Sequence, residues 1–76
     1  MTRKERRIRA DELERELREA RRQLRRAYDA FDLVSDADLI DAWIYEINAW
    51  QARYSSLLRQ RKELEPETVR EDEVRT

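Results

Sequence analysis

The sequence of 76 residues contains no cysteine, no histidine and no glycine. Without cysteine, disulfides and thiolate zinc sites are excluded, and without histidine the commonest general base and metal ligand is missing. The absence of glycine excludes the phosphate-binding and dinucleotide-binding loops that require it. No apolar run approaches the ~20 residues of a membrane span, and the first residues lack the apolar core of a signal peptide. The composition therefore predicts a small, helical, cytoplasmic protein.

Charged residues are abundant, at 46% of the chain, and their net charge is −1. They are unevenly distributed: the net charge is +5 over residues 1–28, −6 over residues 29–52, +3 over residues 53–64 and −3 over residues 65–76. Such blocks indicate either a basic surface for nucleic acid or two segments that neutralise each other when the chain folds back.

Apolar residues in the first half of the chain lie alternately three and four positions apart, which is the heptad spacing of a helix that buries one side. Strong helix formers surround them, and neither glycine nor proline interrupts them. The spacing predicts a helix from about Arg6 to Phe31. The apolar positions are Ala10, Leu13, Leu17, Ala20, Leu24, Ala27 and Phe31.

A second helix is predicted from about residue 36 to residue 64, because the same spacing returns there and Pro66 disfavours a helix in the residue before it. Ser35 is a good N-cap for this helix, and Asp38 three positions later completes a variant of the capping box. The apolar positions of the second helix are Ile40, Trp43, Ile47, Trp50, Tyr54 and Leu57.

The two predicted helices are separated by a short corner over residues 32–35, so they must run antiparallel and side by side. The predicted fold is all-α: a coiled-coil-like antiparallel two-helix hairpin over residues 1–65. Residues 66–76 contain too little apolar surface to offset their ordering entropy and are predicted to form an acidic flexible tail.

Folding back in this way brings the charge blocks together, and we expect the arginines of the first helix to be neutralised by acidic residues of the second. Matching the two apolar seams about the corner predicts three pairs across the hairpin, which are Arg26 with Asp41, Arg21 with Glu46 and Glu14 with Arg53. Each exposed pair contributes little energy, but together they disfavour slipped registers.

The second helix has further apolar residues outside its seam, and the first helix offers little to cover them. An unmatched apolar face of this kind most often becomes an oligomer interface. We expect either a homodimer in a four-helix bundle or a hairpin docked on another protein. The interface residues predicted from this pattern are Leu39, Ile44, Tyr45 and Leu58.

The chain has few candidates for chemistry. Its serines, Ser35, Ser55 and Ser56, have no histidine or cysteine to activate them. The carboxylates that cluster at the start of the second helix are explained by its dipole, and no calcium-loop spacing is present. We therefore expect no enzymatic activity, cofactor, metal ion or small-molecule substrate, and a non-catalytic protein–protein interaction module.

A nucleic-acid contact is the alternative suggested by the N-terminal residues, which have a net charge of +4 over residues 3–9. A frayed basic arm could bind phosphates without sequence preference, whereas the other interpretation is a solvated helix end. The residues of this candidate contact are Arg3, Lys4, Arg6, Arg7 and Arg9.

The stretch Asp38-Leu39-Ile40-Asp41, followed by Ile44-Tyr45-Glu46, resembles the small YaaL-like bacterial proteins, a family of unknown function. The resemblance extends over residues 13–59 and implies a short helical cytoplasmic protein without an assigned activity. A weaker resemblance connects the start of the second helix to sporulation-type aspartyl-phosphate phosphatases, which implies regulation of a phosphorylated response regulator. That family has a Ser-x-Glu-Leu-Asp signature at this point, where this sequence reads Ser35-Asp36-Ala37-Asp38-Leu39-Ile40 and does not keep the Glu-Leu-Asp order.

Overall fold

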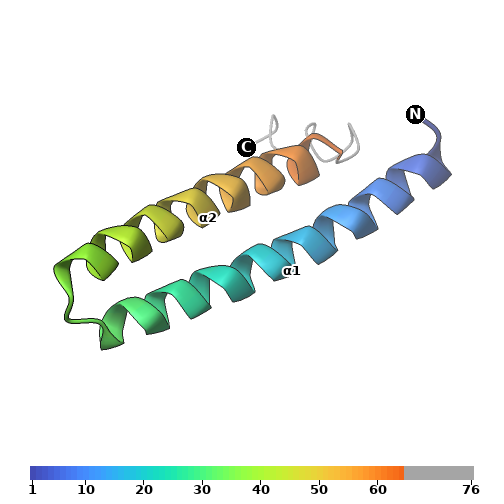
Figure 1. Ribbon diagram of the computed structural model, residues 1–76. Coiled ribbons are helices and arrows are strands. Elements are labelled where there is room, and N and C mark those ends of the chain that lie inside the picture. Colours follow the sequence, from blue (N-terminus) through green and yellow to red (C-terminus); the bar gives the residue numbers. More distant parts are fainter. Residues whose placement is uncertain (65–76) are drawn as a thin grey trace, which may run out of the picture.

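The computed structural model describes residues 1–64, which form two antiparallel helices joined by a short corner (Figure 1). Helix α1 spans Arg3–Leu33 and helix α2 spans Ala37–Glu63. The predicted two-helix hairpin is confirmed, while the predicted acidic tail lies outside the described residues. Neither helix is long and apolar enough to cross a lipid bilayer.

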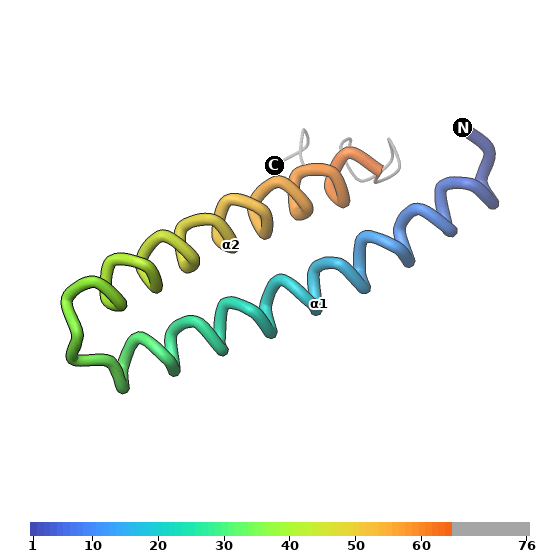
Figure 2. The backbone as a smooth tube through the Cα atoms, viewed as in Figure 1, coloured from blue at the N-terminus to red at the C-terminus, as the bar shows by residue number. Residues whose placement is uncertain are grey.

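The backbone trace shows that the N-terminal end of α1 extends beyond the C-terminal end of α2 (Figure 2). Helix α1 begins at Arg3 and not near Arg6, because Thr2 and Glu5 form a capping box. The Thr2 hydroxyl accepts a hydrogen bond of 3.1 Å from the Glu5 amide, and the Glu5 carboxylate accepts one of 2.8 Å from the Thr2 amide. These two bonds satisfy amides that would otherwise be unpaired at the helix start.

The start of α2 differs from the prediction by one residue, since the N-cap is Asp36 and not Ser35. The Asp36 carboxylate accepts hydrogen bonds from the amides of Asp38 and Leu39, at 2.9 and 3.2 Å. A carboxylate is the stronger acceptor, because its negative charge strengthens both hydrogen bonds and favours the positive end of the helix dipole. Two adjacent residues with capping side chains therefore compete, and the charged one prevails.

The core lies between the two predicted apolar seams and is small. The buried side chains are Leu13, Leu17, Ala20, Ala27, Ile47 and Leu57. Leu13, Leu17, Ala20 and Leu57 form one cluster, against which Trp50, Tyr54 and Leu64 are partly buried. All thirteen predicted seam residues are buried or half-buried, so the heptad spacing identified the inner faces of both helices correctly.

Candidate interaction surfaces

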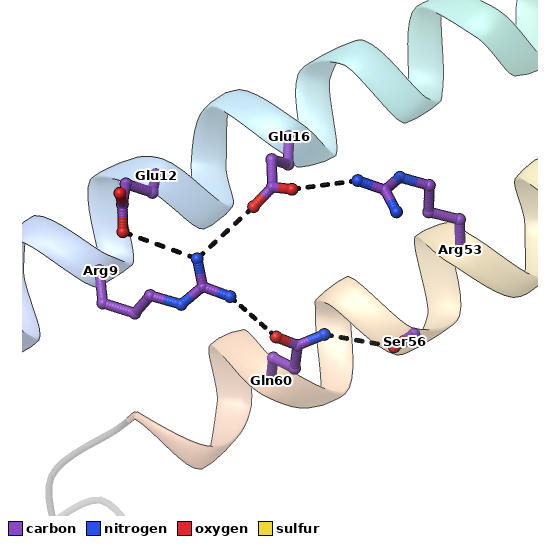
Figure 3. A network of polar contacts seen from close by, with 6 residues as sticks. All are labelled: Arg9, Glu12, Glu16, Arg53, Ser56 and Gln60. Atoms are coloured by element: carbon purple, nitrogen blue, oxygen red, sulfur yellow. Dashed lines mark hydrogen bonds and ion pairs between the residues drawn. The ribbon is translucent and has the colours of Figure 1, made fainter.

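On one side of the seam, a polar network connects the two helices, and Arg9 is its centre (Figure 3). The Arg9 guanidinium donates a hydrogen bond of 3.0 Å to Gln60 and lies 3.6 Å from the carboxylates of both Glu12 and Glu16. Glu16 in turn accepts a hydrogen bond of 3.1 Å from Arg53 on α2. We call this side, defined by Arg9, Glu16, Arg53 and Gln60, the network flank.

The predicted ion pairs across the hairpin were wrong: within residues 1–64 none of them forms, whether Arg26 with Asp41, Arg21 with Glu46 or Glu14 with Arg53. Glu14 instead accepts a hydrogen bond of 3.1 Å from Arg61, two helical turns beyond the predicted partner. Arg53 instead pairs with Glu16. Arginine and glutamate side chains are long enough to reach several positions on a neighbouring helix, so the seam alignment does not determine their partners.

Arg21 and Glu46 also have other partners. The Arg21 guanidinium donates a hydrogen bond of 3.3 Å to the Tyr54 hydroxyl, and its central carbon lies 5.9 Å from the centre of that ring. Glu46 accepts a hydrogen bond of 3.1 Å from the indole N–H of Trp50 on its own helix. The acidic residues of α2 thus do not pair with the arginines of α1 as the charge blocks suggested.

On the other side of the seam, large apolar side chains remain exposed. Ile44, Gln51 and Leu58 share one face of α2 because they are seven residues apart. Tyr28 lies on the same side, since its hydroxyl accepts a hydrogen bond of 2.7 Å from Gln51. Ile44 is 42% exposed, and Leu58 and Tyr28 are each 45% exposed. We call this side, defined by Tyr28, Ile44, Gln51 and Leu58, the open flank.

The four predicted interface residues do not lie on a single face. Leu39 lies on the side of the network flank, since it is fourteen positions from Arg53 and lines a shallow hollow of about 380 Å³ with Arg26, Trp43 and Glu46. Tyr45 is 77% exposed and points away from the seam, being next to Ile44 but a further 100° around the helix. Only Ile44 and Leu58 of the predicted set lie together, and the sequence prediction did not include Tyr28 or Gln51.

The basic N-terminal residues do not form a frayed arm. Arg3, Lys4, Arg6 and Arg7 are exposed within the first turns of α1, whereas Arg9 is half-buried in the network flank. Four of the five candidate nucleic-acid contacts therefore remain accessible, but on an ordered helix. The Thr2-x-x-Glu5 capping signature was the sequence signal for this order.

Two carboxylates have lowered pKa values because they accept hydrogen bonds. The pKa of Glu5 is lowered by the hydrogen bond from the backbone amide of Thr2 and, to a lesser extent, by the Thr2 side chain. The pKa of Glu19 is lowered by hydrogen bonds from Arg22 and then Gln23. Neither carboxylate is prepared to act as an acid or base near neutral pH, since both favour the charged form. Over residues 1–64, no three metal-ligating side chains come together.

Comparison with known proteins identifies a family. The profile of a family described as a protein of unknown function, DUF2508, matches residues 1–65, which is most of the chain. No curated protein and no solved structure matches the chain significantly. The chain therefore belongs to the DUF2508 family, and the resemblance to small YaaL-like bacterial proteins is consistent with this membership.

Proposed function

We propose that this member of the DUF2508 family is a non-catalytic interaction module that pairs with a second copy of itself through the open flank. The supporting observation is the exposure of Tyr28, Ile44 and Leu58 on one side of a hairpin in which six hydrophobic side chains of residues 1–64 are buried. A partner that covers apolar side chains of this kind removes them from water, and this burial stabilises the assembly. A small two-helix unit has few other ways to bury more apolar surface.

The open flank is part of a second heptad seam on α2. Its positions alternate three and four residues apart, as in the seam that holds the hairpin together, and all of them are exposed. An exposed, regularly spaced helical face is suited to packing against another helix. The seam consists of Asp41, Ile44, Asn48, Gln51, Ser55, Leu58 and Lys62.

This seam is complementary to itself in the antiparallel direction, which favours a second copy as the occupant. A two-fold axis at Gln51 places Ile44 of one copy opposite Leu58 of the other. The same axis brings Asp41 near Lys62 of the second copy, so the ends of the seam have opposite charges. An isologous interface requires such self-complementarity, because each residue meets its counterpart in both copies.

Gln51 is suited to the central position on the two-fold axis. Its amide nitrogen donates one hydrogen bond to Tyr28 within the chain. A glutamine amide has a second N–H and a carbonyl oxygen, so two Gln51 side chains can form a reciprocal pair of hydrogen bonds across the axis. A buried polar pair at one seam position specifies register and partner at some cost in stability.

Pairing of two copies along α2 produces an assembly of four helices. In this arrangement the contact between copies runs along α2, while the two α1 helices have arginines of like charge on their exposed sides, including Arg18 and Arg25. Like charges disfavour close packing of the two α1 helices. We therefore expect the α2 helices to make the main contact of the four-helix bundle.

Sedimentation equilibrium of the full chain tests the proposal. We expect a reversible dimer at micromolar concentration, and we expect the double variant Ile44→Glu with Leu58→Glu to be monomeric. The dissociation constant should rise at least about 100-fold, because four apolar side chains per dimer would be replaced by charged ones.

The control is Leu39→Glu, which introduces one glutamate in place of an exposed leucine on the other side of α2. This variant should dimerise like the parent chain. A parent chain that remains monomeric while helical, or a control that is as monomeric as the double variant, would contradict pairing through the open flank.

A further inference from the structure

Four arginines of α1 lie together on its surface, with Arg21 at the edge of the seam, where its guanidinium donates a hydrogen bond to Tyr54. Arg18, Arg21, Arg22 and Arg25 are all exposed, and their side chains surround a shallow hollow of about 310 Å³. Arg21 and Arg22 each lie three or four positions from both Arg18 and Arg25, which places the four on one face over two helical turns. We call these four residues the arginine cluster.

The positive charge of the arginine cluster is only partly compensated within the described chain. Glu19 pairs with Arg22 on the surface of the same helix, and Arg21 contacts the neutral ring and hydroxyl of Tyr54. Arg18 and Arg25 make no ion pair to any residue in 1–64. An exposed ion pair such as Arg22 with Glu19 contributes little energy, so another anion can readily replace Glu19 as the partner of Arg22.

The acidic segment of α2 does not compensate the cluster either. Glu46, which the sequence suggested as a partner of Arg21, accepts a hydrogen bond from Trp50 instead. Residues 15–26 contain six arginines and two glutamates, Glu16 and Glu19. Glu16 pairs with Arg9 and Arg53 on the network flank and does not compensate the cluster. The outer surface of α1 therefore has a local excess of positive charge in a chain of net charge −1.

We propose that the arginine cluster binds the phosphate backbone of a nucleic-acid duplex without sequence preference. Each guanidinium can donate two parallel hydrogen bonds to a phosphate, which makes arginine the suited side chain for this contact. Arg18 and Arg25 are about 10 Å apart along the helix axis at 1.5 Å per residue. An α-helix fits into the major groove of a DNA duplex, and phosphates line both edges of that groove.

A lipid surface is the other polyanion to consider, and the cluster lacks what a membrane-bound helix needs. Interfacial helices insert large apolar side chains beside their basic residues. Between Arg18 and Arg25 the apolar side chains are Ala20, which is buried, and Leu24, which is half-buried in the hairpin. The outer face therefore offers charge without an apolar anchor, which favours nucleic acid.

Fluorescence anisotropy with a labelled DNA duplex of about 20 base pairs tests this proposal on the full chain. We expect binding in low salt that weakens steeply as salt is raised, with the logarithm of affinity linear in the logarithm of salt concentration. The double variant Arg18→Gln with Arg25→Gln should bind about 100-fold more weakly in ~50 mM salt, and its salt slope should be smaller by about two.

The matched control is Arg3→Gln with Arg7→Gln, which removes the same charge from exposed positions nearer the start of α1. The control should retain most of the affinity. The proposal is overturned if the control loses as much affinity as the cluster variant, or if the parent chain does not bind the duplex in low salt. It is equally overturned if the chain binds vesicles containing phosphatidylserine more tightly than it binds the duplex at equal phosphate concentration.

Circular dichroism of both variants must give the helicity of the parent chain, because neither pair of substitutions touches the core.

Discussion

On the network flank, Arg9 contacts Glu12, Glu16 and Gln60, whereas on the open flank Ile44 and Leu58 remain more than two-fifths exposed. The same two helices form both sides. Long charged side chains on the network flank reach across to the opposite helix and satisfy each other within the chain. On the open flank one hydrogen bond also joins the helices, from Gln51 to Tyr28, but Ile44 and Leu58 have no polar group with which to reach the opposite helix and remain exposed.

The comparison shows that the two sides of a two-helix hairpin need different partners. A polar flank can complete its hydrogen bonds internally or with water, and its contribution to stability is modest. An apolar flank can complete its contacts only when another surface covers it. Substitutions in the seam that both flanks share should therefore have the largest effects, and substitutions in one flank should leave the other flank unchanged.

The largest effect is expected from the shared seam. Leu17→Ala removes a buried side chain of the cluster that contains Leu13 and Leu57, so the free energy of unfolding should fall by about 2–5 kcal/mol. Urea unfolding followed by circular dichroism measures this loss. Tyr45→Ala is the control and should change the free energy of unfolding by less than ~0.5 kcal/mol, because Tyr45 is exposed. Equal losses in the two variants would mean that the seam is not the core.

The open flank can be broken at the ends of its seam. Asp41→Lys would place two lysines near each other at both ends of the proposed dimer, and the dissociation constant should rise about tenfold in low salt. Adding Lys62→Asp restores opposite charges and should restore the affinity of the parent chain. Sedimentation equilibrium at two salt concentrations measures both variants. A double variant as weak as the single one would rule out this pairing of charges.

The network flank can be broken at the residue that joins its two arginines. Glu16→Gln removes the ion pairs with Arg9 and Arg53, so the free energy of unfolding should fall by about 0.5–1 kcal/mol in low salt. The difference should shrink in high salt, because exposed ion pairs are screened. Thermal unfolding measures this change, and the dimer dissociation constant should stay as it is. A marked change in dimerisation would show that the two flanks are not independent.

The smallest effect is expected at the start of α1, beyond the end of both flanks. The pKa of Glu5 is lowered below its ordinary value of 4.5 by the hydrogen bond from the Thr2 amide. Because the pKa of Glu5 is lower in the folded chain than in the unfolded chain, this stabilisation is fully present at pH values above the unfolded pKa. It is lost as the pH falls through the folded pKa. Amide exchange at Glu5 and Arg6 should therefore accelerate, relative to the intrinsic rate, between about pH 5 and pH 3. Glu5→Gln, which does not titrate in this range, should show no such change.

The sequence predicted the hairpin and its inner faces well, because heptad spacing reports directly which side of a helix is buried. It placed the N-cap of α2 at Ser35, since spacing alone does not decide between Ser35 and Asp36. It also missed the early start of α1, although Thr2 and Glu5 have the spacing of a capping box.

The candidate surfaces were only partly predictable. Apolar residues outside the seam were recognised from their positions, but Leu39 and Tyr45 were grouped with Ile44 and Leu58, although a rotation of 100° per residue already separates them around α2. The partners of Glu14 and Arg21 could not be predicted, because their long side chains can reach several residues of the opposite helix and the seam alignment does not determine which one they contact. Gln51 was missed because it is distinguished by its hydrogen bond to Tyr28 on the other helix, which the spacing of apolar residues does not predict.

Cysteine cross-linking tests pairing through the open flank most directly, since the chain has no cysteine of its own. Under mild oxidation, Gln51→Cys should form a disulfide-linked dimer efficiently, because a two-fold axis at this residue brings both thiols together. Ile44→Cys alone should not cross-link, but a mixture of Ile44→Cys with Leu58→Cys should. Efficient cross-linking of Ile44→Cys with itself, or of Leu39→Cys in place of Gln51→Cys, would contradict the antiparallel pairing.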